Sequence, residues 1–460
     1  MGRMRLLVSR NRWLIIAVIS FLIGLIIRFY YGLTTDFWND EAISYFNSTD
    51  LSWRELFFSN GNFSDFRHPP LYYIYLKLML IIGHADWWLR LTSLIWFFPS
   101  IYLVYRISLF FKSRKTSYLA ISLFSLHPLL INLSFQVRPY ALLIFLMLLL
   151  IYVIFSNFFY PKVYKTILIG FLLSICFFIS YGVIWLIFSL FFLAIFLFFK
   201  KEKMHSKNIF CSLFLFFVCS IYQICILLNY LLPIKNGNAI AGSVPYFDLN
   251  WFVYQTKLLF GHDFVGFYFP LFLVIITTNL KKDKSLINQF LFFSSTGTIG
   301  LATIISILFF PVFLARQLVL FSLLVVFVFA QFHQKLRYEF FMMITLLILA
   351  INSFNNYGFL FRENIQNTIK QKIPSNSIVL LMDDVDLISY YLLINKNNSS
   401  VYLIERDSSQ NQNLQNELLS LASRNVFFIM NQAYSSDELK IKESLENNIC
   451  QKHHCLDIEL

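Results

Sequence analysis

The chain has 460 residues, of which 58% are apolar and only 13% are charged. Soluble domains carry about 25% charged residues, so this composition excludes an ordinary soluble enzyme and a disordered chain. The net charge is +12, from 37 Lys and Arg against 25 Asp and Glu. In a membrane protein such an excess gathers in cytoplasmic loops, so it does not indicate nucleic-acid binding. The composition predicts a polytopic membrane protein.

Eleven apolar runs indicate membrane spans, since a spanning helix takes about 20 mostly apolar residues. They lie near residues 13–33, 89–111, 116–133, 139–159, 166–181, 183–199, 209–232, 264–280, 286–310, 317–332 and 338–356. Arginines precede the first run, which is long for a signal peptide and is followed by no small-residue cleavage pattern. We therefore expect an uncleaved first span that enters the membrane from the cytoplasm.

The cations of the loops predict the orientation. Every second connection is rich in lysine and arginine, and the short connections between them hold single cations. The cation-rich connections contain Lys112, Arg114 and Lys115; Lys162 and Lys165; Lys200, Lys201, Lys203 and Lys207; Lys281, Lys282 and Lys284; and Lys335 and Arg337. By the positive-inside rule these loops and the N-terminus are cytoplasmic. An odd number of spans then predicts an extracytoplasmic C-terminal tail.

Two segments differ from the spans. The segment 70–83 is apolar but short, contains Lys77, and would reverse every later loop if it crossed the membrane. We expect an interfacial helix there, within a long first outer loop over 34–88. The charged segment 359–460 contains the strand-length apolar runs SIVLLMDDVDL and NVFFIMN, with helix-like stretches around them. We expect an all-α membrane domain over 1–358 and a small extramembrane α/β-type domain over 359–460.

Acidic residues avoid the predicted spans. Seven lie between Asp36 and Asp86 in the first outer loop, and none lies between Trp87 and Lys201. Ion-coupled transporters usually need carboxylates inside the membrane. The distribution therefore argues against a transporter and favours chemistry at the outer face.

Asp40 and Glu41 follow the first span and stand among aromatic residues, in the sequence TTDFWNDEAISYF. A carboxylate held near an apolar surface can have a raised pKa and act as a base. The alternatives are a solvated loop acid or an N-cap for a helix that begins near Glu41.

Three other stretches hold candidate binding residues. In FRHPPLYYIYLK, His68 could face an anion and Tyr72 could supply a hydroxyl, although an interfacial aromatic belt explains the tyrosines equally. Gln136, Arg138 and Tyr140 stand at an outward span end, and Arg316 stands at another. An arginine there could bind a phosphate through a bidentate contact, or it could extend to lipid headgroups.

Taken in order, four elements resemble the multi-spanning GT-C glycosyltransferases, in particular bacterial members similar to protein O-mannosyltransferases and aminoarabinose transferases. The elements are Asp40-Glu41-Ala42, His68-Pro69-Pro70-Leu71-Tyr72-Tyr73, Arg90-Leu91-x-Ser93 and Ser134-x-Gln136-x-Arg138-x-Tyr140. They span roughly residues 1–160, with Arg316 as a weaker point beyond. The resemblance implies a GT-C-like fold and a glycosyltransferase in the bacterial inner membrane.

The resemblance also implies the reaction and its residues. A polyprenyl-phosphate-linked sugar would be the donor, and a lipid, a glycan or a protein would supply the acceptor hydroxyl. Asp40 would be the general base and Glu41 would assist or orient it. His68, Arg138 and Arg316 would hold the lipid phosphate, with Tyr72, Gln136 and Tyr140 as further substrate-binding residues. No cofactor is expected, and a divalent metal near Asp40 is left open.

Three departures leave the sugar open. Relatives often have Glu after the residue that matches Gln136, where this chain has Val137, and often Tyr where it has Gln317. His68 replaces a lysine of the aminoarabinose transferases, which argues against that activity.

Other functions and sites account for part of the sequence. A non-catalytic flippase of lipid-linked saccharides would share the size and span count, but would more often carry charges within spans. A membrane acyltransferase would use an embedded histidine, and we interpret His127-Pro128 as structural. In the tail, Cys450 and Cys455 are expected to form a disulfide in an oxidising compartment. The alternatives are two free thiols and a metal site that combines the cysteines with His453 and His454.

Overall fold

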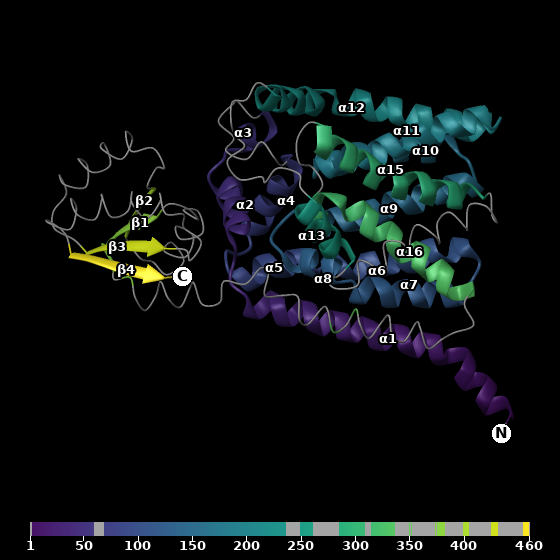
Figure 1. Cartoon of the computed structure of the whole chain (residues 1–460), viewed down its shortest axis with the longest axis horizontal. Helices are drawn as coiled ribbons and strands as arrows, with labels where there is room; N and C mark the ends of the chain where they lie inside the picture. The colour runs from purple at the N-terminus through teal and green to yellow at the C-terminus, as the bar shows by residue number, and fades with distance from the viewer. Residues whose placement is uncertain are drawn as a thin grey trace. The chain divides into compact units, whose positions relative to one another are not determined.

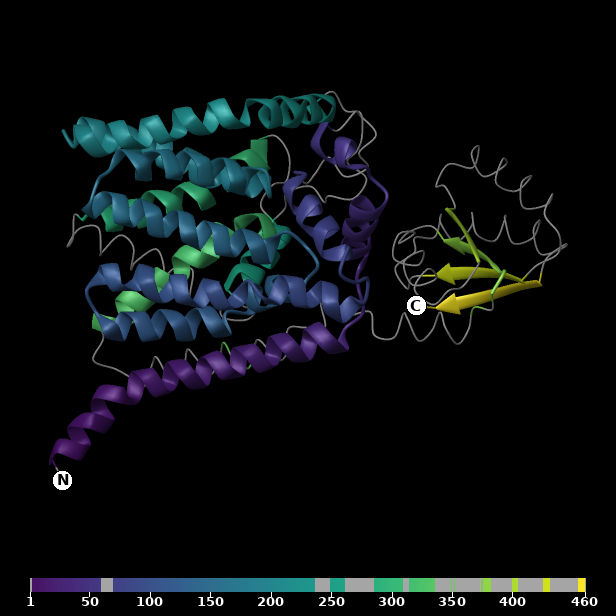
Figure 2. The same cartoon turned by 180° about the vertical axis from the view of Figure 1, so that it is seen from behind.

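The computed structural model describes residues 2–58, 69–235, 249–260, 285–308, 314–335, 349, 351, 373, 375–381, 399–403, 425–430 and 454–459. The chain forms two compact units, one of Met1–Leu33 and Ser52–Gly358, the other of Thr34–Leu51 and Phe359–Leu460. The first unit is a bundle of helices, and the second contains helix α2 and a β-sheet (Figure 1; Figure 2). The second unit thus joins the tail to Thr34–Leu51, which the sequence assigned to the first outer loop.

The described elements are mostly helical, as predicted. The helices are α1 (Gly2–Thr34), α2 (Asn39–Thr49), α3 (Trp53–Phe58), α4 (Leu71–Leu80), α5 (Asp86–Leu94), α6 (Phe97–Ser108), η1 (Leu109–Phe111), α7 (Arg114–Leu126), α8 (Pro128–Phe135), α9 (Tyr140–Phe159), α10 (Val163–Phe177), η2 (Tyr181–Val183), α11 (Ile184–Phe199), α12 (Lys203–Lys235), α13 (Leu249–Phe260), α15 (Leu286–Leu308), η4 (Ala315–Leu318) and α16 (Val319–Lys335). The strands are β1 (Ile378–Leu381), β2 (Ser400–Leu403), β3 (Asn425–Met430) and β4 (His454–Glu459).

Within the described residues, six helices are long and apolar enough to cross a membrane, and the bent pair α7–α8 makes a seventh candidate. Helix α10 and the segment Ala315–Gln331 are shorter apolar helices that match two further predicted spans. The predicted span 264–280 lies outside the described residues, and 338–356 is described only at Leu349 and Ile351. Helix α4 has 10 residues and is too short to cross a bilayer core of about 30 Å.

Helix α9 lies at the centre of the bundle. In its most apolar stretch, 67% of the residues are buried. The corresponding share is 33% in α1 and 28% in α12, and these two helices run along opposite sides of the bundle (Figure 1).

The end of α9 is satisfied by a buried lysine. Because lipid offers no hydrogen bonds, the backbone groups of each helix, including those at its ends, need partners within the protein. The buried ammonium of Lys165 does this for α9, because it donates to the carbonyl oxygens of Ser156, at 3.1 Å, and Tyr160, at 3.0 Å.

Helices α7 and α8 form a broken span where the sequence predicted an unbroken one over 116–133. Their axes differ by 60°. His127 joins them in an extended conformation, and Pro128 is the first residue of α8. A proline has no backbone N–H and its ring clashes with the preceding turn, so a helix running through this position would lose hydrogen bonds. The bend follows from that loss.

A glycine allows α1 to approach this bend closely, and its replacement is expected to destabilise the bundle. A Cβ at Gly24 would lie 2.3 Å from the backbone oxygen of Ser125. Gly24→Ala should cost about 1–3 kcal/mol through overpacking, measured as a lower melting temperature in detergent. Gly300→Ala is the matched control, because a Cβ there meets nothing within 4 Å. Equal melting temperatures for the two variants would contradict the expectation.

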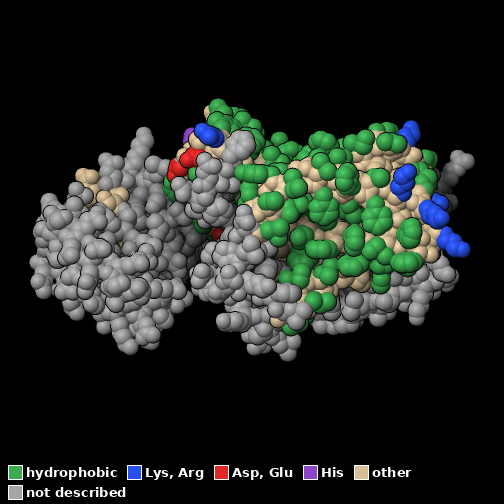
Figure 3. Space-filling model, turned by 90° about the horizontal axis from the view of Figure 1, so that it is seen from above, with side chains coloured by type: hydrophobic (Ala, Val, Ile, Leu, Met, Phe, Trp, Pro, Cys, Tyr) green, Lys and Arg blue, Asp and Glu red, His purple; other side chains and the backbone are tan. Residues whose placement is uncertain are grey.

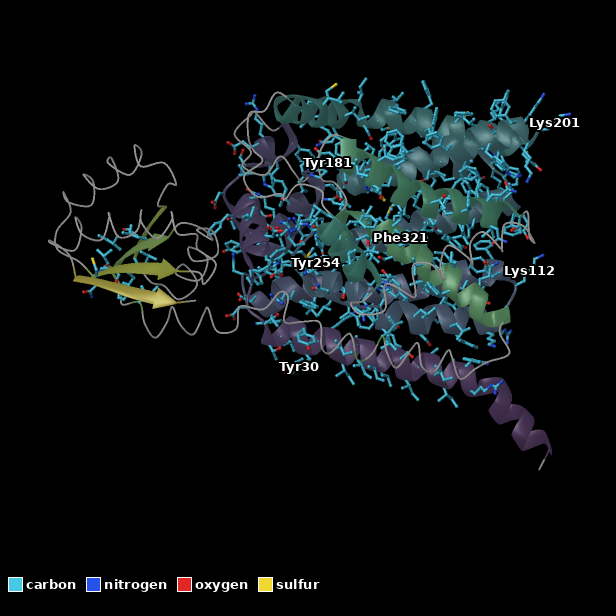
Figure 4. The ribbon with its side chains drawn as sticks, in the orientation of Figure 1. Tyr30, Lys112, Tyr181, Lys201, Tyr254 and Phe321 are labelled. Carbon is cyan, nitrogen blue, oxygen red and sulfur yellow. The ribbon has the colours of Figure 1, made fainter. Side chains whose placement is uncertain are left out.

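The two ends of the bundle differ in charge. Lys112 and Lys201 lie at one end, and Tyr30 and Tyr181 lie at the opposite end (Figure 4). On one face, apolar side chains cover the helices, and Lys and Arg gather at an end (Figure 3). The cation-rich loops that hold Lys112 and Lys201 therefore share one end, as the predicted alternation requires. We call this end the basic end, and the end that carries Tyr30 and Tyr181 the aromatic end.

The second unit contains a parallel sheet of four strands in the order β2-β1-β3-β4. Ile378, Val379 and Leu380 are all fully buried. Successive side chains of a strand point to opposite faces, so both faces of β1 are covered, as is usual in parallel sheets. Strands β1 and β3 lie within the two predicted apolar runs. The predicted helical stretches around them lie outside the described residues.

Strand β4 bears on the metal and disulfide predictions. His454 and Cys455 are neighbours in this strand. Cys455 is disulfide-bonded, whereas Cys176, Cys211, Cys219 and Cys225 are free. Cys450 and His453 lie outside the described residues.

The disulfide predicts a labelling pattern in intact cells. A membrane-impermeant thiol reagent should label Cys455 only after reduction, because disulfides persist in oxidising compartments. A variant with both tail cysteines replaced by Ser is the control and should remain unlabelled. Labelling that appears only after the cells are broken open would place the tail in the cytoplasm and contradict the predicted orientation.

Candidate functional site

The candidate acids lie in the first turn of α2, in the second unit. The Glu41 side chain is buried, and its Oε2 accepts a hydrogen bond from the backbone N–H of Trp38 at 3.2 Å. Glu41 thus caps the helix N-terminus, which favours negative charge. Asp40 is half-buried, and its backbone oxygen accepts a bond from the Ser44 hydroxyl at 2.9 Å. The N-cap alternative is wrong in detail, because the helix begins at Asn39 with Trp38 as its N-cap and Glu41 bonds back to it from the third helical position. Asp40 is the more exposed acid of the pair.

In the first unit, α4 is tied to the end of α5 and the residues that follow it. The Tyr75 hydroxyl donates to the backbone oxygen of Thr92 at 2.7 Å and accepts from Trp96 Nε1 at 3.2 Å. Burial raises the pKa of Tyr75, against the opposing effect of these two bonds, so the hydroxyl stays a donor at neutral pH. Tyr72 is buried, with its ring 6.2 Å from that of Tyr75.

His68 lies outside the described residues, so the predicted anion-facing role of this side chain stays a prediction. The two prolines that follow it lead into α4 as expected. The backbone N–H of Leu71 donates to the carbonyl oxygen of Phe178 at 3.0 Å. This bond anchors the start of α4 at the end of α10.

Three buried arginines surround the last turn of α8 and the junction that follows it. Arg28 of α1 donates from Nε to the Ser134 hydroxyl at 2.9 Å. The Arg90 guanidinium of α5 lies 5.7 Å from the centre of the Phe135 ring. Arg138 follows in the short junction between α8 and α9. Each of the three is at most 2% exposed, and charges buried within a membrane protein are costly and usually functional.

The α8–α9 junction also buries polar groups beside Arg138. Gln136 donates from Nε2 to Asn132 Oδ1 at 2.9 Å. Tyr140, the first residue of α9, is fully buried, and within the described part of the chain its hydroxyl has no hydrogen-bond partner; the same holds for Ser93 Oγ of α5. A buried hydroxyl without a partner costs about 1–3 kcal/mol, so these two groups mark places where a ligand or a water would bind.

Arg316 lies in η4, at the aromatic end of the bundle. The segment is held on both sides, because the N–H of Ala315 donates to Gln255 Oε1 at 2.9 Å and a Cβ at Gly182 would lie 2.8 Å from the Gln317 oxygen. Helix η4 also packs against α8. Arg316 itself is half-buried. The structure therefore brings Arg90, Arg138 and Arg316 to the same end of the bundle.

Two features of the site were not predicted from the sequence. Arg28 was not singled out, although a lone cation late in the first apolar run was the signal that could have found it. The bend that directs α8 toward Arg28 was also missed.

Among the described residues, no group of three or more His, Cys, Asp or Glu could hold a metal ion.

The first unit thus places guanidinium groups and buried hydroxyls at the aromatic end of an apolar helical bundle. Such groups bind phosphate through charge-assisted hydrogen bonds, and the apolar helices suit a lipid chain. The half-exposed carboxylate of Asp40 is the candidate proton acceptor. Anion binding by the first unit and proton abstraction by Asp40 of the second unit are the roles that we propose for these residues below.

Comparisons with known proteins find one similar family and a similar fold. Residues 67–224 match the model of the dolichyl-phosphate-mannose-protein mannosyltransferase family. Comparison with curated protein sequences finds no match. The fold is similar to that of the Archaeoglobus fulgidus oligosaccharyltransferase, which was crystallised tethered to an acceptor peptide, with a TM-score of 0.51 and 10% identity over 96% of this chain and 69% of that one. The chain is thus a multi-pass membrane protein whose residues 67–224 resemble a mannosyltransferase family and whose fold is similar to that of an oligosaccharyltransferase, in agreement with the GT-C resemblance of its sequence motifs.

Proposed function

We propose that the protein transfers a sugar from a polyprenyl-phosphate-linked donor to an acceptor hydroxyl on the outer face of the membrane. The observation that carries the proposal is the buried Arg138 at one end of an apolar bundle, two residues before Tyr140, whose buried hydroxyl has no hydrogen-bond partner among the described residues. An arginine held there suits the phosphate of a lipid whose chain lies among the helices. The match to a mannosyltransferase family that uses a lipid phosphate supports the same donor class.

The reaction is a single displacement with inversion at the anomeric carbon. Asp40 accepts the proton of the acceptor hydroxyl, whose oxygen forms a bond to that carbon. The bond between the same carbon and the phosphate oxygen breaks, and the polyprenyl phosphate leaves with the electron pair. Arg138, Arg316 and His68 stabilise the charge that develops on the leaving phosphate. Tyr72, Gln136 and Tyr140 hold the donor in place, and Glu41 orients the helix turn that carries Asp40.

The orientation follows from the charges of the two ends. The basic end faces the cytoplasm by the positive-inside rule, so the aromatic end with Arg138 faces the outer side. The disulfide at Cys455 supports a tail on the outer side. The membrane is the bacterial inner membrane, and the acceptor is a lipid, a glycan or a protein.

The test uses the full-length protein in lipid nanodiscs with a panel of synthetic undecaprenyl-phosphate hexoses and an acceptor extract from the native envelope. We expect free undecaprenyl phosphate to appear by mass spectrometry for at least one sugar, together with a glycosylated acceptor. A flippase would move the donor between leaflets without breaking the sugar–phosphate bond. Transport of an intact donor with no undecaprenyl phosphate released would contradict the proposal.

A further inference from the structure

We infer that Arg28 is a positioning residue for donor binding, because it braces the bend between α7 and α8 and thereby sets the position of Arg138. The inference rests on the proposed function, since it assigns Arg28 a part in holding the donor phosphate. Arg28 is fully buried in the first candidate span, and no step of the reaction above uses it.

The guanidinium of Arg28 connects both limbs of the broken span to α1. Its Nη1 donates to the backbone oxygen of Ser125, in the last turn of α7, at 2.7 Å. Its Nε donates to the hydroxyl of Ser134, in the last turn of α8, at 2.9 Å. A third bond joins Nη1 to the oxygen of Gly24, one turn back in α1, at 2.9 Å. One side chain thus spans the bend and holds both limbs.

The bend leaves the Ser125 carbonyl without its helical hydrogen-bond donor, and Arg28 supplies one. In an unbroken helix the Ser125 oxygen would accept a bond from the N–H four residues later, but the break at His127 and Pro128 ends the α7 ladder. A carbonyl left without a donor inside a membrane protein is costly. The arginine supplies that donor from another helix, and its charge also suits the negative partial charge of the helix end.

Packing leaves the guanidinium little freedom. It lies 4.0 Å from the centre of the Phe97 ring, and that ring stacks on Phe21 of α1 and Phe124 of α7. Gly24 lets α1 approach closely enough for the Ser125 bond. Lysine keeps the charge but lacks the planar fork that reaches both limbs at once.

The consequence for donor binding follows from chain connectivity. Arg138 lies four residues beyond Ser134, and the junction between them is short. Helix α8 has 8 residues and so forms a lever about 12 Å long. If the Arg28 bonds are lost, α8 can turn about the bend, and the Arg138 side chain moves with the C-terminal end of α8. Arg28 therefore acts on the phosphate through Arg138 rather than by contact.

The first experiment measures the affinity of the nanodisc-embedded protein for undecaprenyl phosphate. Arg28→Lys should weaken binding about tenfold, and Ser134→Ala, which removes only one bond to the brace, about threefold. When Arg28→Lys is added to Arg138→Lys, the further loss should be less than about twofold, because both changes disturb one unit. Arg106→Lys is the matched control: Arg106 lies in α6 and bonds to Tyr102 and Tyr152, so it should bind like wild type.

The second experiment needs no donor. Val137 is fully buried in the junction, so Val137→Cys, made with Cys211, Cys219 and Cys225 replaced by Ala, should react slowly with a thiol reagent. Adding Arg28→Ala should speed the reaction at least about tenfold if α8 turns away, whereas adding Arg106→Ala should not. This measurement tests whether Arg28 holds the junction, even if the wild-type protein fails to bind undecaprenyl phosphate. Such a failure to bind would contradict the proposed donor and not the role of Arg28.

The inference is overturned by either of two results. Equal losses of affinity from Arg28→Lys with and without Arg138→Lys would show that the two arginines act independently. An unchanged labelling rate of Val137→Cys in the Arg28→Ala protein would show that Arg28 does not hold the junction.

Discussion

Replacing Asp40 by Asn is expected to abolish sugar transfer while the protein stays folded. The amide has nearly the same shape but cannot accept the acceptor proton, and general-base catalysis contributes about 10²–10⁴-fold, or roughly 3–5 kcal/mol of barrier. The measurement is the initial rate of product formation by protein in nanodiscs, normalised to the amount of folded protein from size-exclusion chromatography.

Glu41→Gln is the matched control, one residue away and equally conservative. Its side-chain oxygen can still accept the bond from the Trp38 N–H, because Gln serves as well as Glu at this position of a helix N-terminus. We expect its rate to stay within about tenfold of wild type. Full activity of Asp40→Asn, or loss of activity in Glu41→Gln alone, would remove Asp40 from the role of base.

Replacing Arg138 should weaken donor binding. Arg138→Lys keeps the charge but loses the planar, bidentate geometry, and Arg138→Ala also loses the charge. Bonds to charged groups contribute about 1.5–3 kcal/mol, so the alanine variant should bind undecaprenyl phosphate about 10–150-fold more weakly, with lysine in between. The quantity measured is the dissociation constant in nanodiscs.

Two controls make the Arg138 result specific. Arg106→Ala removes another arginine of the bundle, at a position that bonds to tyrosines of α6 and α9, and should leave the affinity unchanged. Arg316→Lys tests the second proposed phosphate ligand and should produce a smaller loss, because Arg316 is half-buried. Unchanged affinity in both Arg138 variants would exclude this residue from the phosphate site.

The spans were the most predictable part of the fold, because each is a long apolar run and lipid permits only a helix there. The bend at His127–Pro128 was not predicted. The proline interrupts the helix, but the 60° angle between α7 and α8 also involves packing against α1, whose Arg28 bonds to both helices from about 100 residues away in the chain. Strands β2 and β4 were missed because neither forms a purely apolar run, as β4, with the sequence HCLDIE, shows. They are defined by their pairing to β1 and β3.

The candidate site was predicted in its parts and not in its arrangement. The motifs indicated Arg90 and Arg138 separately, but only helix packing brings Arg90 over Phe135, three residues before Arg138. The resemblance assigned Asp40 as the base and Glu41 as its helper, without a geometric reason for the difference. Their roles separate once the helix begins at Asn39, because the Glu41 side chain then reaches back to the Trp38 N–H.

The most direct test of the proposed function compares the envelope lipids and glycans of the native host with and without the gene by mass spectrometry. We predict that a polyprenyl-phosphate-linked sugar accumulates in the deletion strain, that an envelope glycan, lipid or protein loses that sugar, and that the wild-type gene reverses both changes while Asp40→Asn reverses neither. Unchanged lipid and glycan profiles in the deletion strain, or full reversal by Asp40→Asn, would contradict the proposed glycosyltransferase.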